Sequence, residues 1–199
     1  MRVLLFTGLI SVLVPIAAAA GIHTWDVREV FSNADGTIQY VELWEADGGA
    51  GETGVGNGTV SSNTRNLPIA NGPVAPPTTN KSYLLATAAF AALSGAPTPD
   101  KIIPAGSVPF FNTAGDTVSF VGFDAWTFGA VPTDGINSRD RMSGIGTNTP
   151  KNYAGTQGQV NAAPQPAVPL LPGPMVAFAL LLVMGVGIGY LVTARPTTR

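Results

Sequence analysis

The sequence predicts an all-β fold, and three observations favour it. Glycine and proline are abundant, with 24 and 17 residues among 199. Short runs rich in Val, Thr, Phe and Trp recur between these turn-forming residues, whereas few segments have a helical period. The chain contains no cysteine, so neither disulfides nor thiolate metal sites are available. We therefore expect many short strands held together by an apolar core.

The first residues have the features of a secretory signal peptide, which we assign to residues 1–20. Arg2 is followed by the mostly apolar segment 3–16 and then by four alanines. Ala18 and Ala20 supply the small-x-small pattern that precedes a cleavage site. The mature chain would then begin at Gly21, and the alternative is an uncleaved N-terminal anchor.

A second apolar segment, Met175 to Val192, predicts a transmembrane helix. Its 18 residues carry no charge, and at 1.5 Å per residue they span roughly 27 Å, close to the ~30 Å thickness of the hydrocarbon layer. A buried core helix would need a polar face, which this segment lacks. Arg195 and Arg199 in the basic tail 193–199 favour a cytoplasmic C-terminus, with the preceding domain outside. Two such helices could also pack through the Gly185-x-x-x-Gly189 pair.

The expected exported part is long enough for one domain, residues 21–145, and a tail. From Gly21 to Pro174 there are 12 acidic residues and 7 lysines and arginines, a formal charge of −5. Nucleic-acid binding requires a basic surface to contact phosphates. The composition therefore argues against nucleic acid as a partner.

Thr24 to Glu45 predicts a β-hairpin. Two runs rich in aromatic and β-branched residues flank a Ser-Asn-Ala-Asp-Gly segment, and its Asp35-Gly36 pair favours a tight turn. In the second run Val41 and Leu43 share one face, which we expect in the core. The opposite face alternates apolar and charged side chains and is expected to be amphipathic.

The glycine-rich segment Asp47 to Gly58 is expected to be a mobile surface connection. A phosphate-binding turn would need a helix directly after the glycines, and the following residues do not favour one. A calcium ion held by Asp47 and Glu52 is the alternative, because oxygen ligands on a flexible loop suit calcium.

The remaining elements follow from apolar runs between turn residues. Residues 59–80 are polar and proline-rich, with room for one short edge strand. We expect strands at 82–87, 101–103, 116–123 and 125–131, with one or two helical turns within 88–93. Apolar residues become sparse after Pro132, so residues 146–174 are predicted to form a Pro/Gly/Asn-rich tether.

The order of several short motifs resembles the lamin-tail-like domain, over about Trp25 to Arg141. The motifs are Val27-x-Glu29-Val30, Tyr40-Val41-Glu42-Leu43, Tyr83-Leu84-Leu85-Ala86, Gly115-Asp116-Thr117-Val118-Ser119-Phe120 and Ser138-Arg139. The resemblance implies an immunoglobulin-like antiparallel β-sandwich. It also implies a surface or secreted module of bacterial exported proteins, a type of domain without a fixed chemistry.

The C-terminus resembles a sorting signal of the Pro-Glu-Pro type, which exosortase-like enzymes recognise and cleave. Pro169, Pro172 and Pro174 stand where the proline motif would be, before the hydrophobic helix and the basic end with Arg195 and Arg199. The chain lacks the glutamate of that motif and is less basic than many such tails. Plain membrane anchoring is therefore the alternative to processing by a peptidase.

Few residues suggest catalysis, and no cofactor is expected. His23 is the only histidine, so a histidine metal cluster is excluded and a Ser-His-Asp relay would have to form at the new N-terminus. Glu29 and Glu42 would act as a glycosidase acid and base only if their carboxyl groups faced one cleft, roughly 5 to 10 Å apart. The alternative places them on a solvent-exposed hairpin face or beside Arg28.

Three hypotheses about function remain. The favoured one is a non-enzymatic envelope protein that displays its β-sandwich for surface, matrix or adhesive interaction. The second is a carbohydrate-binding module that uses Trp25, Trp44 and Trp126, because aromatic faces stack on sugars; these side chains could instead fill the core. The third is a hydrolase with its site on the glycine-rich loop, such as a phosphoesterase or glycosidase.

Overall fold

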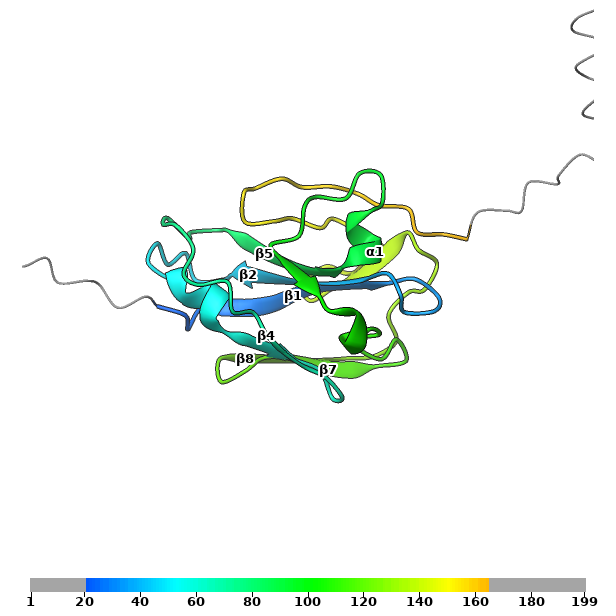
Figure 1. The fold of residues 1–199 in the computed structure, drawn as a ribbon, viewed down its shortest axis with the longest axis horizontal. Helices are drawn as coiled ribbons and strands as arrows, with labels where there is room; N and C mark the ends of the chain where they lie inside the picture. The colour runs from blue at the N-terminus through cyan, green and yellow to red at the C-terminus, as the bar shows by residue number, and fades with distance from the viewer. Residues whose placement is uncertain (1–20, 165–199) are drawn as a thin grey trace, which may run out of the picture. The chain divides into compact units, whose positions relative to one another are not determined.

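The computed structural model describes residues 21–164, which form a domain of two β-sheets (Figure 1). The larger sheet has the order β10-β9-β1-β2-β5-β6, and the smaller one has the order β4-β3-β7-β8. The only α-helix of this part is the single turn α1, Ala88–Ala91. The prediction of an all-β fold is therefore confirmed. The strands are β1 Trp25–Ser32, β2 Gln39–Glu45, β3 Thr59–Ser61, β4 Asn66–Pro68, β5 Ser82–Thr87, β6 Lys101–Ile103, β7 Asp116–Phe120, β8 Asp124–Phe128, β9 Asn137–Asp140 and β10 Gly144–Thr147.

The predicted hairpin is the centre of the larger sheet. β1 and β2 pair antiparallel over their full lengths, and the register shifts by one residue between Val27 and Glu29. Gly36 has φ +72° in the connecting turn, a conformation that suits glycine. β2 then pairs on its other side with β5, whose six residues are all buried.

The larger sheet is not purely antiparallel, contrary to the expectation. β6 pairs with β5 in parallel, with Leu85 opposite Lys101. The chain makes this crossover through α1 and residues 92–100, where Thr87 caps the helix by accepting a hydrogen bond from the Phe90 amide at 3.2 Å. The short helix and its following turn thus replace the hairpin that an antiparallel neighbour would need.

The main core lies between the two sheets. It combines Val27, Val41 and Leu43 of the larger sheet with Val118 and Phe120 of the smaller one, among other buried apolar residues. These positions alternate along their strands, as expected for the inner faces of two packed sheets. Val41 and Leu43 therefore occupy the core as the sequence predicts.

A second core covers the outer face of the larger sheet, where an amphipathic face was expected. Tyr40, Leu84 and Phe90 are fully buried there against Val160. Residues 148–160 form this cover, as Figure 1 shows in yellow and orange beside β5 and α1. The face is consequently apolar in its interior rather than solvated.

Residues 146–163 were expected to belong to a tether, and the structure instead packs them on the domain. Asn148 is buried and its side-chain amide donates to the carbonyls of Ile136 and Val160, at 2.6 and 2.8 Å. Its Oδ1 accepts from the Val160 amide at 2.9 Å. Gly95 has φ +81°, and a Cβ there would lie 2.4 Å from the carbonyl oxygen of Gln159, so the segment approaches too closely for a side chain. Hydrogen bonds and close backbone contacts hold this segment on the domain. Its low apolar content did not predict this packing.

Several predicted features lie outside the described residues. They are the signal peptide 1–20 with Ala18 and Ala20, the proline motif, the hydrophobic helix 175–192 with its two glycines, and the basic tail 193–199. Within residues 21–164, no helix combines the length and the hydropathy needed to cross a membrane.

Candidate functional site

The strongest concentration of polar groups lies on the outer face of the larger sheet, where Glu29 of β1 stands directly opposite Glu42 of β2. Both side chains are buried, with exposed fractions of 2% and 6%. Like charges opposite each other in a sheet are destabilising. These carboxyl groups must therefore be stabilised by hydrogen bonds or be neutralised by a proton. The two glutamates differ in this respect.

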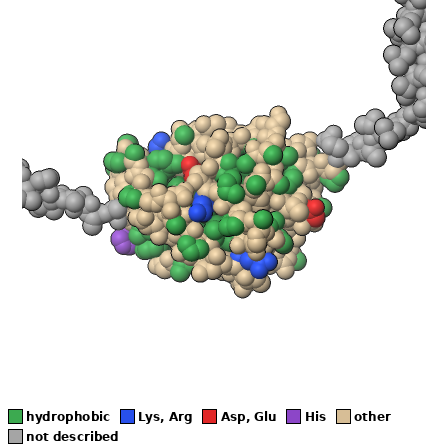
Figure 2. Space-filling model, in the orientation of Figure 1, with side chains coloured by type: hydrophobic (Ala, Val, Ile, Leu, Met, Phe, Trp, Pro, Cys, Tyr) green, Lys and Arg blue, Asp and Glu red, His purple; other side chains and the backbone are tan. Residues whose placement is uncertain are grey.

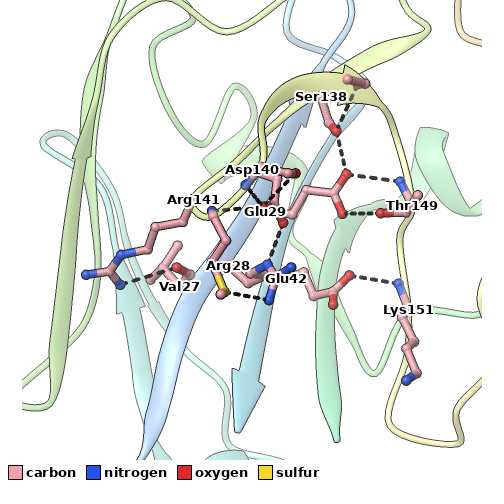
Figure 3. Close-up of polar contacts among 12 residues, drawn as sticks. Val27, Arg28, Glu29, Glu42, Ser138, Asp140, Arg141, Thr149 and Lys151 are labelled. Atoms are coloured by element: carbon pink, nitrogen blue, oxygen red, sulfur yellow. Dashed lines mark hydrogen bonds and ion pairs between the residues drawn. The ribbon is translucent and has the colours of Figure 1, made fainter. Parts of the chain in front are cut away.

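Glu29 is surrounded by hydrogen-bond donors from three parts of the chain. Oε1 accepts from the Tyr40 hydroxyl at 2.6 Å, from the Ser138 hydroxyl and from the Thr149 amide at 3.0 Å. Oε2 accepts from the Thr149 hydroxyl at 3.1 Å. Figure 3 shows the side chains of Ser138 and Thr149 both directed at the carboxyl group of Glu29. This carboxyl group joins β1, β2, β9 and residues 148–160.

Glu42 has fewer donors, and burial raises its pKa to about 8. The Ser82 hydroxyl and the Lys151 amide partly offset this effect, whereas the charge of Glu29 reinforces it. The Lys151 amide donates to Oε2 at 2.8 Å. At pH 7 Glu42 is therefore mostly protonated, and its neutral form relieves the repulsion within the pair.

An ion pair closes one side of this cluster. Arg28 donates from Nε to Oδ2 of Asp140 at 2.5 Å, and its guanidinium lies 5.1 Å from the centre of the Trp44 ring. Burial would raise the pKa of Asp140, but hydrogen bonds from Arg28, Ser143 and Met142 hold it below the ordinary value. Arg28 thus pairs with Asp140 rather than with a glutamate, which differs from the alternative expected from the sequence.

A hollow of about 230 Å³ lies beside these groups. Its lining is mostly polar, and Trp44 is its one aromatic side chain. The other lining residues are Arg28, Glu29, Glu42, Ser82, Asp140, Thr149, Lys151 and Gln157. An aromatic ring among hydrogen-bonding groups suits a small polyhydroxylated ligand better than an apolar one.

The structure separates the three tryptophans that were candidates for glycan contact. Trp25 is fully buried in the main core and donates from Nε1 to the Glu52 carbonyl at 2.7 Å, so its assignment to a ligand surface was wrong. Trp126 lies on β8 in the other sheet, where it packs on Phe128 with 5.0 Å between the ring centres. Trp44 alone lines the polar hollow.

The glycine-rich segment is packed in its second half, residues 53–58, whereas residues 47–51 are mostly exposed, as expected of a surface connection. Thr53–Asn57 forms a 3₁₀ turn in which Val55 is fully buried. A Cβ at Gly56 would lie 2.0 Å from the carbonyl oxygen of Gly72, so the glycine permits a close backbone contact. Gly56 therefore permits close packing. A high glycine content alone does not show whether a segment is packed or flexible.

The candidate calcium ligands of this segment are not brought together. Glu52 accepts from the His23 amide at 2.7 Å, and Asp47 is exposed. Within residues 21–164, no three His, Asp or Glu side chains converge in a way that could hold a metal ion. His23 itself is exposed and packs edge-on against Phe123, with no serine-based relay around it in the described structure.

Four polar residues of the cluster were missed by the sequence analysis: Ser138, Asp140, Thr149 and Lys151. They follow Pro132, where apolar residues become sparse. Ser138 was named only as part of the Ser138-Arg139 motif, and Thr149 and Lys151 belong to the predicted tether 146–174. The sequence contained only an indirect indication that these residues belong to the cluster. Two glutamates on neighbouring predicted strands require donors if they are buried, and residues 132–153 contain many polar groups that could supply them.

Comparisons with protein-family models, curated proteins and solved structures find no match to this chain.

Proposed function

We propose that this protein is an exported envelope protein that displays a non-enzymatic, immunoglobulin-like β-sandwich at the cell surface. The hydrophobic segment 175–192 anchors it in the membrane, or a peptidase processes it there and releases the domain to the surface or the medium. The signal peptide, the uncharged span and the basic tail support this topology. Its role is interaction with matrix or other extracellular partners, and no cofactor takes part.

The observation that carries the non-enzymatic part is the use of Glu29. Four donors from the domain itself occupy its carboxyl oxygens: the Tyr40 hydroxyl on β2, the Ser138 hydroxyl on β9, and the amide and hydroxyl of Thr149. A catalytic base needs a lone pair that faces its substrate. We therefore interpret the carboxyl pair as a structural junction that holds residues 148–160 on the sheet.

The lamin-tail-like assignment is supported by where its motifs fall. The five motifs lie on or directly beside β1, β2, β5, β7 and β9, with Tyr40 to Leu43 at the centre of the larger sheet. Each of the five motifs thus coincides with a strand or its border, which an immunoglobulin-like β-sandwich requires. The lysines and arginines on the face shown in Figure 2 are scattered rather than gathered into one patch.

Surface display can be tested on intact cells. A membrane-impermeant protease and an antibody to the domain are applied to cells that make the full chain. We expect binding of the antibody to unpermeabilised cells, and loss of that signal after protease treatment, while a cytoplasmic marker stays intact. Antibody access only after permeabilisation would contradict the proposal.

A second candidate function is carbohydrate binding, favoured by the position of Trp44 in the polar hollow. Protonated Glu42 supplies a donor at neutral pH, and Gln157 and Lys151 add further hydrogen-bonding groups. The aromatic ring would stack on the apolar face of a sugar. The hypothesis now depends on Trp44, because Trp25 is in the core and Trp126 lies on the other sheet.

A glycan panel tests this candidate. Millimolar or tighter binding that is lost in Trp44→Ala but kept in Trp126→Ala, with both variants folded, would support it. The absence of binding across a broad panel would count against it. A hydrolase that uses the glycine-rich loop has less support, because the second half of this loop is packed and Glu52 accepts a hydrogen bond from the His23 amide.

A further inference from the structure

Gly21, the expected first residue of the mature chain, is fitted closely into the domain. Its carbonyl accepts from the Gly54 amide at 2.8 Å, and its own nitrogen donates to the Gly51 carbonyl at 3.2 Å. Both partners flank Glu52, at the start of the 3₁₀ turn Thr53–Asn57. The position of Gly21 is therefore determined by the same turn that packs Val55 into the core.

The space at Gly21 is limited by the carboxyl group of Glu52. A Cβ at this position would lie 2.3 Å from Oε1 and 2.6 Å from the carboxyl carbon. Adding one Cα–Cβ bond length to that distance places the Gly21 Cα within about 4 Å of Oε1. The Gly21 Cα therefore lies close to Oε1 of Glu52, and the α-nitrogen of Gly21 is bonded directly to this Cα.

Few groups among residues 21–164 offset the negative charge of Glu52. Its Oε2 accepts from the His23 amide at 2.7 Å, and Oε1 accepts no hydrogen bond from residues 21–164. The one ion-pair contact found for Glu52 among these residues is with Nδ1 of the exposed His23, at 4.0 Å, which is charged only when protonated. The side chain of Glu52 is 18% exposed, so solvent screens this carboxylate only in part.

We propose that the Glu52 carboxylate is a docking site for the α-ammonium group of Gly21 that signal-peptide removal creates. This inference rests on the proposed export. Hydrolysis of the Ala20–Gly21 bond by a peptidase consumes one water molecule and leaves a carboxylate on Ala20 and an amine on Gly21, which takes a proton from solvent. A peptide nitrogen has one N–H, whereas the ammonium has three. One N–H keeps the bond to the Gly51 carbonyl, and a second forms a charge-assisted bond to Oε1.

Processing would therefore complete the fold at this end of the domain. A free amine on Gly21 is produced only by cleavage before this residue. An unprocessed chain retains the neutral peptide bond and leaves Glu52 without its cationic partner. Cleavage and stability are linked because the ammonium binds the folded domain and not the unfolded one.

The test compares mature chains that differ only at the amino end. Chains 21–199 are released from a cleavable N-terminal fusion in detergent, with Gly21 first or with Ala19 and Ala20 retained. We expect the thermal midpoint to be about 2 °C or more higher for the chain that begins at Gly21. In Glu52→Gln the two chains are expected to melt together, while in the control Asp47→Asn the difference is kept.

A second readout follows the amine itself. Acylation of the Gly21 amine at pH 7 is expected to be several-fold slower in the native chain than in Glu52→Gln, because the ion pair favours the protonated, unreactive amine. Equal midpoints for the two native chains, or a difference that persists in Glu52→Gln, would overturn the docking site. These measurements use purified protein, so they can fail while export is confirmed in cells, and the reverse is equally visible.

Discussion

At the scale of single residues, the domain depends on how it treats buried acids. Glu29 and Glu42 face each other across β1 and β2, yet Glu29 is surrounded by hydrogen-bond donors and Glu42 is mostly protonated at pH 7. The sequence places both glutamates on the predicted hairpin. It does not show their burial, because the covering residues come from more than 100 positions later in the chain.

The raised pKa of Glu42 predicts a dependence of stability on pH. The unfolded chain releases this proton near the ordinary value of 4.5, whereas the folded domain retains it until about pH 8. The contribution of Glu42 is therefore fully present below pH 4.5 and is lost as the pH rises to about 8. The slope from this group is at most about 1.4 kcal/mol per pH unit.

Urea unfolding of the wild type and of Glu42→Gln, between pH 4.5 and 8.5, measures this contribution. Glutamine keeps an acceptor for the Lys151 amide but does not titrate. We expect the wild type to lose stability relative to the variant as the pH rises. A constant difference across this range would show that Glu42 titrates normally.

Removal of the Glu29 carboxyl group is expected to be severe. Glu29→Ala leaves the Tyr40 and Ser138 hydroxyls and the Thr149 amide without their acceptor in a buried site. The expected loss is about 3 kcal/mol of unfolding free energy. Thr149→Val removes one side-chain donor and serves as the milder comparison, at about 1 kcal/mol. Equal effects of the two substitutions in urea unfolding would contradict the junction.

At the scale of elements, residues 148–160 close the second core and are a structural part of the domain. They bury Tyr40, Leu84 and Phe90 with Val160, and Asn148 ties the two ends of the segment together. The hairpin, β5 and β6 could be predicted from apolar runs and turn residues. The packing of residues 148–160 could not be predicted in this way, because it depends on one buried valine and on hydrogen bonds rather than on a long apolar run.

Truncation separates a structural cover from a tether. A chain of residues 21–163 is expected to fold with a cooperative thermal transition. A chain of residues 21–147 exposes Tyr40, Leu84 and Phe90 and removes the donors at Thr149 and Lys151. We expect it to be insoluble or to melt at least 10 °C lower, because several buried side chains lose their cover. Similar melting temperatures of the two chains would show that the residues after 147 are a tether rather than part of the domain.

At the scale of the whole molecule, an all-β domain with two cores lies between two apolar ends of the sequence. Its buried acids are used within the fold, and the polar hollow beside Trp44 offers a place for a small hydrophilic ligand. Composition and turn residues were enough to predict the all-β class. The tryptophans and the glycine-rich loop were harder to interpret, because core packing and ligand binding favour the same residue types.

The most direct test of the account is the intact mass of the protein in each fraction of cells that make the full chain. Display at the envelope predicts a product that begins at Gly21 and is found in the membrane, surface or medium fraction. An end at Arg199 in the membrane fraction would mean simple anchoring, and an end near Pro169 to Pro174 in the surface or medium fraction would mean processing. A product that retains Met1 and stays in the cytoplasmic fraction would contradict the central claim.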